Sequence, residues 1–125
     1  MKPISSVPVI HVSNLKSAIT YYQQILGFKP DFIFDDAVFL HLEEVCIHLS
    51  GPEDPGIKKT PGQAHLCIDL EDVDPYYQKV ISKGAVIQLP LEARSYGMRD
   101  FALADPDGNT LVFGSAMPPQ IQLTP

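Results

Sequence analysis

The sequence has few basic residues, only two cysteines and no long apolar run. Nine lysines and arginines stand against fifteen aspartates and glutamates, which gives a net charge of -6. Without a basic patch to neutralise phosphates, we expect no nucleic-acid partner, and the acidic balance favours neutral or cationic ligands as well as solubility. No run of apolar residues approaches the length that spans a membrane, so we expect no membrane partner.

The cysteines, Cys46 and Cys67, lie in strand-like runs and lack Cys-x-x-Cys spacing. No signal peptide precedes them, so we predict reduced, buried thiols in a cytoplasmic protein and not a disulfide framework. A hydrophobic content of 45% and a charged content of 19% are typical of globular proteins. A chain of 125 residues can bury one core but not two independent ones, which predicts a single domain over residues 1–125.

The first half of the chain predicts the order β-α-β-β-β. Residues 7–12 are strand-like, and Pro8 implies that the ladder does not need its N-H there. Asn14 is a candidate N-cap for a helix whose apolar residues recur every three or four positions, and Gly27 is expected to end that helix. Three further strands are predicted over residues 30–34, 37–42 and 45–49.

The second half repeats this order after a linker at residues 52–62 that is rich in proline and glycine. A strand is predicted at residues 65–70, followed by a helix capped by Asp72 and ended by Gly84. Strands at residues 86–91, 100–104 and 110–115 follow. The last two flank Asp105-Pro106-Asp107-Gly108-Asn109, whose residues predict a tight turn. A Pro-rich tail occupies residues 117–125.

The two halves are also similar to each other in sequence. Tyr21-Tyr22 and Tyr76-Tyr77 occupy the same place in the two predicted helices, and a glycine follows each helix. We therefore predict an α+β fold made of two β-α-β-β-β modules, at about residues 5–51 and 63–116.

Two segments resemble a known family. One is the closing hairpin, with Tyr96-Gly97-Met98-Arg99-Asp100-Phe101, the turn and Leu111-Val112-Phe113, and the other is residues 12–28, with Tyr21-Tyr22 and Leu26-Gly27-Phe28. They are similar to the glyoxalase, bleomycin-resistance and dioxygenase group, the vicinal oxygen chelate superfamily, over about residues 5–116. The resemblance implies a curved, barrel-like mixed sheet around a cavity. It also implies a homodimer, with or without exchange of modules, which would bury sheet edges.

Alternation along the strands divides their side chains between a face under the helices and a face that lines the cavity. Apolar residues such as Ile47, Ile68 and Leu111 suit the helix side. The residues predicted to face the cavity are Phe39, His41, Glu43, Cys46, His48, Ser50, His65, Cys67, Asp69, Thr110, Val112 and Gly114.

The metal-dependent members of the family place one ligand on the first and last strand of each module. The resemblance puts these positions at Val7, His48, His65 and Val112. Valine has no lone pair to donate, so the usual ligand set is incomplete and we expect no metal or other cofactor. Binding of a metal by His48 and His65 together with Cys46 or Cys67 stays open, although same-face residues two apart on a strand lie about 6–7 Å apart.

Two residues precede the closing hairpin, where the family often covers its cavity with a loop. Arg94 could meet a carboxylate there, and Tyr96 could meet a ring. His41, Glu43, His48, His65 and Asp69 are candidate general bases, but sequence alone places none of them beside a substrate. The predicted ligand-binding residues are Phe39, His41, His48, His65, Arg94, Tyr96 and Phe101.

Two functions from different classes follow from these residues. The first is a metal-free homodimer, similar to bleomycin-resistance proteins, that binds a partly aromatic antibiotic or metabolite between Phe39, Phe101, Tyr96 and the cavity histidines. The second is a metal-dependent lyase, isomerase or dioxygenase with an altered site built on His48 and His65. Its other ligands would come from Cys46, Cys67, Glu43, His41 or the partner chain. Family membership carries fold more securely than activity, which favours the first.

Overall fold

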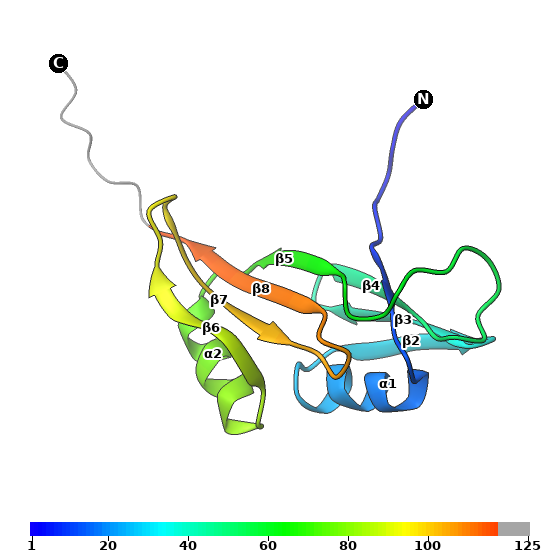
Figure 1. Ribbon diagram of the computed structural model, residues 1–125. Helices are drawn as coiled ribbons and strands as arrows, with labels where there is room; N and C mark the ends of the chain where they lie inside the picture. The colour runs from blue at the N-terminus through cyan, green and yellow to red at the C-terminus, as the bar shows by residue number, and fades with distance from the viewer. Residues whose placement is uncertain (118–125) are drawn as a thin grey trace, which may run out of the picture.

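Two β-α-β-β-β modules follow one another along the chain in a computed structural model that describes residues 1–117 (Figure 1). The predicted tail at residues 117–125 lies almost wholly outside the described residues. The elements of the first module are β1 (Val9–His11), α1 (Leu15–Gln24), β2 (Lys29–Phe34), β3 (Ala37–Leu42) and β4 (Val45–Ser50). Those of the second are β5 (His65–Asp69), α2 (Val73–Ser82), β6 (Val86–Ala93), β7 (Met98–Ala104) and β8 (Thr110–Ala116).

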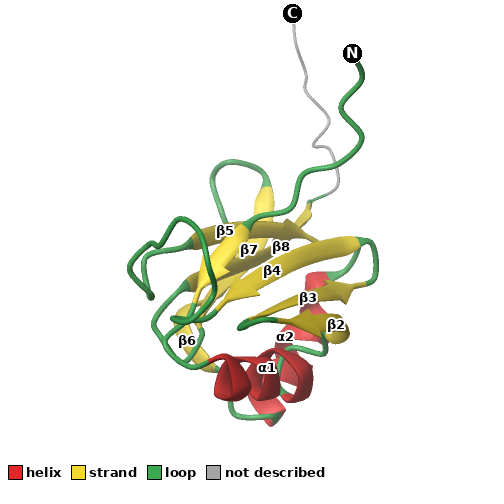
Figure 2. Ribbon diagram, turned by 90° about the vertical axis from the view of Figure 1, so that its right-hand side faces the viewer, coloured by secondary structure: helices red, strands yellow, loops and turns green. Residues whose placement is uncertain are grey.

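Each module forms one open, four-stranded mixed sheet. The strand orders are β1-β4-β3-β2 and β5-β8-β7-β6, with β1 parallel to β4, β5 parallel to β8, and the other pairs antiparallel. Both helices lie on the same side of the sheets, and residues 1–8 leave on the opposite side (Figures 1 and 2). The predicted order of elements and the α+β class are confirmed.

The helix boundaries follow from their caps. The Asn14 side chain accepts a hydrogen bond from the Ser17 backbone N-H at 2.9 Å, as an N-cap should. Gly27 follows α1 with a φ of 86°, a left-handed value that glycine adopts without strain. Strand β1 is shorter than predicted because it begins only after Pro8, although the Pro8 carbonyl still accepts the His48 N-H at 3.0 Å.

The core lies between the helices and the sheet faces that they cover. It is continuous across both modules, since buried residues of both helices and both sheets belong to one cluster. The largest fully buried side chains are Tyr22, Phe28, Phe101, Phe113, Ile10, Leu26, Leu40, Ile47, Leu49, Leu103, Leu111 and Val12.

The two modules are joined by tyrosines that reach from one to the other. Tyr22 in α1 donates from its hydroxyl to the Asp105 carboxylate in the β7-β8 turn at 2.8 Å, and Tyr21 donates to the Ala104 carbonyl at 3.0 Å. Tyr76 in α2 donates to the Leu26 carbonyl at 2.7 Å. Burial raises the pKa of Tyr21 to about 12, and burial together with the Asp105 charge raises the pKa of Tyr22 further. Both phenols therefore stay protonated and keep donating.

The β7-β8 turn is organised around the same carboxylate. One oxygen of Asp105 accepts the backbone N-H groups of Asp107 and Asn109, each at 2.9 Å, and the other accepts the Asn109 side-chain amide at 2.9 Å. The Asn109 amide oxygen in turn accepts the Ala64 N-H at 2.9 Å, which holds the end of the inter-module loop. At Gly62 in that loop, φ is 94° and a Cβ would collide with the Asp107 carbonyl oxygen, so only glycine fits.

Within residues 1–117, no helix has both the length and the apolar character needed to cross a membrane.

The Tyr22-Asp105 hydrogen bond is expected to stabilise the fold more than the Tyr21-Ala104 bond, because its acceptor is a buried carboxylate. Tyr22→Phe should lower the free energy of unfolding by about 1.5–3 kcal/mol, and the matched variant Tyr21→Phe by about 0.5–1.5 kcal/mol. Urea denaturation measures both values. Equal losses in the two variants would contradict the special role of Asp105.

Candidate functional site

The candidate site lies on the two sheet faces that carry no helix, which we call the open faces. Val45, Ile47 and Leu49 of β4 pack toward α1, and the alternating residues point to the open face, as predicted. The same alternation in β5 turns Ile68 inward and leaves His65 and Cys67 exposed. The open faces therefore bring together the side chains from which a binding site can be built.

An aromatic shelf, formed by Phe32, Phe34, Phe39 and His48, covers the open face of the first sheet. The Phe39 ring centre lies 4.4 Å from that of His48 and 5.3 Å from that of Phe32, while Phe34 stacks on Phe32 at 5.7 Å. Phe32 is 57% exposed and Phe34 is 43% exposed. Rings stacked in contact with solvent offer a flat apolar surface to a planar ligand.

His48 lies at the base of this shelf with one nitrogen unused. Its Nε2 atom is buried and has no hydrogen-bond partner among residues 1–117. Buried polar atoms in native structures usually have a partner, so this nitrogen is available to a ligand or to water. His41 lies on the same face but is already engaged, because its Nδ1 is 2.6 Å from the Asp31 carboxylate.

A pocket of about 550 Å³ occupies the open face of the second sheet, and we call it the second-module pocket. Its wall is mostly apolar, and its ionisable groups include His65 and Asp69. A few polar groups in an apolar pocket of this size are typical of small-molecule sites. The residues that line it are His65, Cys67, Ile68, Asp69, Leu89, Tyr96, Met98, Asp100, Val112 and Gly114.

Tyr96 and Arg94 are held beside this pocket by a buried carboxylate. Asp100, only 4% exposed, accepts a hydrogen bond from Arg94 Nε at 2.8 Å and another from the Tyr96 hydroxyl. These bonds raise the pKa of both donors, which keeps Tyr96 protonated and Arg94 charged. Tyr96 also lines the pocket.

The carboxylates that Arg94 contacts belong to its own chain and not to a ligand. Besides Asp100, its guanidinium contacts Glu92 Oε2 at 2.9 Å and the Pro90 carbonyl at 2.6 Å. Arg94 therefore shapes the loop and has little capacity left for a ligand. Arg99 is paired in the same way, with two bonds of 2.9 Å to the Asp74 carboxylate in α2.

The structure corrects two predictions. Phe101 does not line the cavity: it is fully buried, because it pairs with Phe113 across β7 and β8 and both rings pack under α2 against Tyr76 and Tyr77. The thiols of Cys46 and Cys67 are exposed, not buried, because both cysteines lie on the open faces, which no helix covers.

The residues present do not fit the metal site of the metal-dependent members. Two of the four ligand positions, Val7 and Val112, carry side chains without a lone pair, and Val112 lines the second-module pocket where a ligand would be needed. Across the part of the chain that the structure describes, no three His, Cys, Asp or Glu side chains are grouped so that they could hold a metal ion.

Sequence reasoning missed two rings of the aromatic shelf, Phe32 and Phe34. Strand β2 has an irregularity between Pro30 and Phe32, which shifts its register so that Phe32 pairs with Phe39. The alternating Phe-Ile-Phe pattern at residues 32–34 is a signal that puts both phenylalanines on one face, and its pairing with Phe39 supplies the rest.

Comparison with known proteins identifies relatives along nearly the whole chain. The sequence profile of the Glyoxalase/Bleomycin resistance protein/Dioxygenase superfamily matches residues 6–113. Bleomycin resistance proteins from Geobacillus stearothermophilus and Staphylococcus aureus are each 28% identical over 125 residues, which covers 88% of this chain and 95% of the relative.

Solved structures share the fold. A virulence protein from Salmonella typhimurium is 22% identical and superimposes with a TM-score of 0.77, covering 94% of this chain and 99% of the other. A bleomycin-binding protein from bleomycin-producing Streptomyces verticillus, complexed with copper(II)-bleomycin, is 21% identical with a TM-score of 0.75 and the same coverage.

The different surroundings of two phenylalanines predict different costs of truncation. Phe101→Ala should lower the free energy of unfolding by about 3–5 kcal/mol, because it leaves a cavity in the core. Phe34→Ala removes a ring that is already partly in water and should cost about 1 kcal/mol or less. Chemical denaturation of both variants compares them, and a larger loss for Phe34→Ala would refute the assignment of faces.

Proposed function

This chain belongs to the Glyoxalase/Bleomycin resistance protein/Dioxygenase superfamily, and from that premise we propose that it is a small-molecule-binding protein that acts as a homodimer. Its ligand is a partly aromatic antibiotic or metabolite, as the names of the bleomycin resistance relatives suggest. The observation that carries the proposal is the aromatic shelf, in which the exposed, stacked rings of Phe32 and Phe34 pack on the half-buried ring of Phe39.

The shelf suits a planar group for a physical reason. Exposed aromatic rings cost free energy in water, and a planar ligand that stacks on them recovers part of it. His48 Nε2 adds one unused hydrogen-bonding atom at the base of the shelf, which can fix the orientation of the bound ring.

The second-module pocket can supply further contacts to the ligand. Its apolar wall with Asp69 and His65 suits a ligand that has an apolar body and a polar or cationic group. Asp100 does not offer a free charge there, because Arg94 neutralises it. The net charge of -6 favours the approach of a cation to either open face.

No observation in the described residues favours the metal-dependent alternative. A lyase, isomerase or dioxygenase would need at least one more ligand beside His48 or His65, and the described residues supply no such group. A partner chain would have to complete the site.

A second copy of the chain would cover apolar surface at the outer edges of the sheets. Strand β2 forms one outer edge and exposes Phe32 and Ile33, and strand β6 forms the other and exposes Val86 and Leu89. Unprotected apolar edges favour pairing with another strand. A homodimer would cover these edges, and the second chain would also enclose part of the open faces.

The cysteines support a cytoplasmic location. Both are free, and both thiols are exposed. Exposed thiols without a partner suit a reducing compartment better than an oxidising one.

Removal of one ring of the aromatic shelf should selectively weaken the binding of aromatic ligands. Copper(II)-bleomycin serves as the first probe, followed by a panel of planar aromatic cations scored by the rise in melting temperature. For a probe that binds, Phe39→Ala should raise Kd about tenfold, because stacking contributes about 0.5–1.5 kcal/mol beyond the apolar area. Isothermal titration calorimetry measures the change.

Ile81→Ala is the matched control, since Ile81 is an exposed apolar residue on α2, away from the open faces. Its Kd should equal that of the unmodified protein. A panel without any binder, or equal weakening by both substitutions, would refute the proposed site.

Dimer formation should protect the thiols on the open faces. Sedimentation is expected to show twice the mass of the chain. At protein concentrations that favour the dimer, Cys46 and Cys67 should react more slowly with a thiol reagent than in urea-unfolded protein or in dilute monomer. A monomer at every concentration, or thiols of equal reactivity in the dimer, would contradict the assembly.

A further inference from the structure

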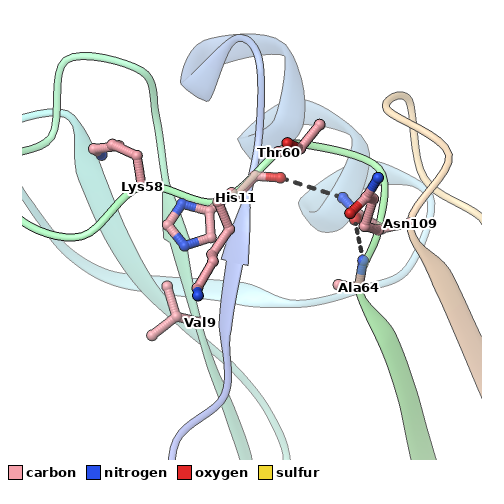
Figure 3. A pocket seen from close by; sticks show the side chains of 8 residues that line it. Val9, His11, Lys58, Thr60, Ala64 and Asn109 are labelled. Atoms are coloured by element: carbon pink, nitrogen blue, oxygen red, sulfur yellow. Dashed lines mark hydrogen bonds between the residues drawn. The ribbon is translucent and has the colours of Figure 1, made fainter.

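A separate pocket lies between strand β1 and the loop that joins the modules (Figure 3). Its volume is about 440 Å³, within the range of small-molecule sites. His11 lies in the middle of the pocket, with Lys58 on one side and Thr60, Ala64 and Asn109 on the other (Figure 3).

The lining of this pocket is rich in hydrogen-bond donors and contains no carboxylate. Lys58, Lys59, His11, Thr60 and Gln63 all carry side-chain donors. A smaller adjoining cavity of about 220 Å³ shares Lys58, Lys59 and His11, and it too lacks a carboxylate in its lining. In a chain with a net charge of -6, this concentration of positive charge is unusual and is not explained by the binding of a cationic aromatic ligand.

The two lysines have different roles. Lys58 Nζ donates to the Gly51 carbonyl at 2.9 Å and to Ser50 Oγ at 3.2 Å, which fixes the ammonium group against the end of β4. Lys59 makes no hydrogen bond or ion pair with any residue in the described range 1–117, so its ammonium is free for a ligand.

The positive charges around His11 affect its pKa. Partial burial and the charges of Lys58 and Lys59 lower its pKa, and His48 acts in the same direction. Asp54, the acidic group that acts on His11, raises the pKa by a smaller amount and does not line the pocket. The imidazolium form is therefore disfavoured until a negative charge enters.

We propose that this pocket binds the phosphate group of a small molecule, held by Lys58, Lys59 and His11. Two ammonium groups and an imidazole suit a phosphate dianion better than they suit a ligand with one carboxylate. The hydroxyl donor of Thr60 and the amide donor of Gln63 suit the remaining phosphate oxygens. The volume leaves room for the organic part of a phosphate ester. The pocket borders the aromatic shelf, because Val9 pairs with His48 between β1 and β4, but none of the residues proposed to hold phosphate belongs to the shelf.

Inorganic phosphate is the probe, titrated into the intact protein at constant ionic strength made up with chloride. Binding should be saturable and should raise the melting temperature, and acetate at the same concentrations should bind more weakly. The pKa of His11, followed by NMR of its ring protons, should rise when phosphate is present, because the dianion stabilises the imidazolium.

Lys59→Gln is the main test variant, because Lys59 makes no contact that the fold needs and Lys58 pins the loop. It should weaken phosphate binding about fivefold, the loss expected for a charge-assisted contact at an exposed site. Lys16→Gln removes the same charge from an exposed position on α1 and should leave phosphate binding unchanged.

Three results would overturn the proposal. The first is a response to phosphate that does not saturate or that equals the response to chloride. The second is acetate binding as strong as phosphate binding. The third is equal weakening of phosphate binding by Lys59→Gln and Lys16→Gln, which would show that only the net charge of the protein matters.

Discussion

The buried carboxylate of Asp105 joins the two halves of this protein. It accepts two backbone N-H groups of its own turn on one oxygen, and the Tyr22 hydroxyl and the Asn109 amide on the other. A buried charge is tolerated only when its hydrogen bonds are made, so the turn, helix α1 and the end of the inter-module loop must assemble together. These bonds tie α1 to the second sheet, and both helices lie on the same side of the sheets (Figures 1 and 2).

The uncovered faces are the consequence of that arrangement. With both helices on one side, the apolar residues of each strand that point the other way are not covered by a helix (Figure 2). Phe32 and Phe34 on one sheet and the wall of the second-module pocket on the other are then left for a ligand or a second chain. The core and the site thus come from the two alternating faces of the same strands.

The sequence predicted features that depend on local chemistry. The Asn14 cap, the turn at Asp105 and the order of the strands follow from residue type and periodicity. Phe101 was misplaced because its face depends on its register with Phe113 across two strands, which a single strand pattern does not fix. The exposure of Cys46 depends on tertiary surroundings, and the pairing of Arg94 with Asp100 depends on the register of β6 against β7, which residue types alone do not fix.

Residues 1–8 leave β1 on the side of the open faces, away from the helices (Figures 1 and 2). An affinity tag fused ahead of Met1 would therefore extend over the same side as the aromatic shelf and the pocket around His11. A polyhistidine tag would also bring imidazoles close to a surface that holds His11 and His48. Recombinant protein with such a fusion can gain metal through the tag, or lose ligand binding through simple obstruction.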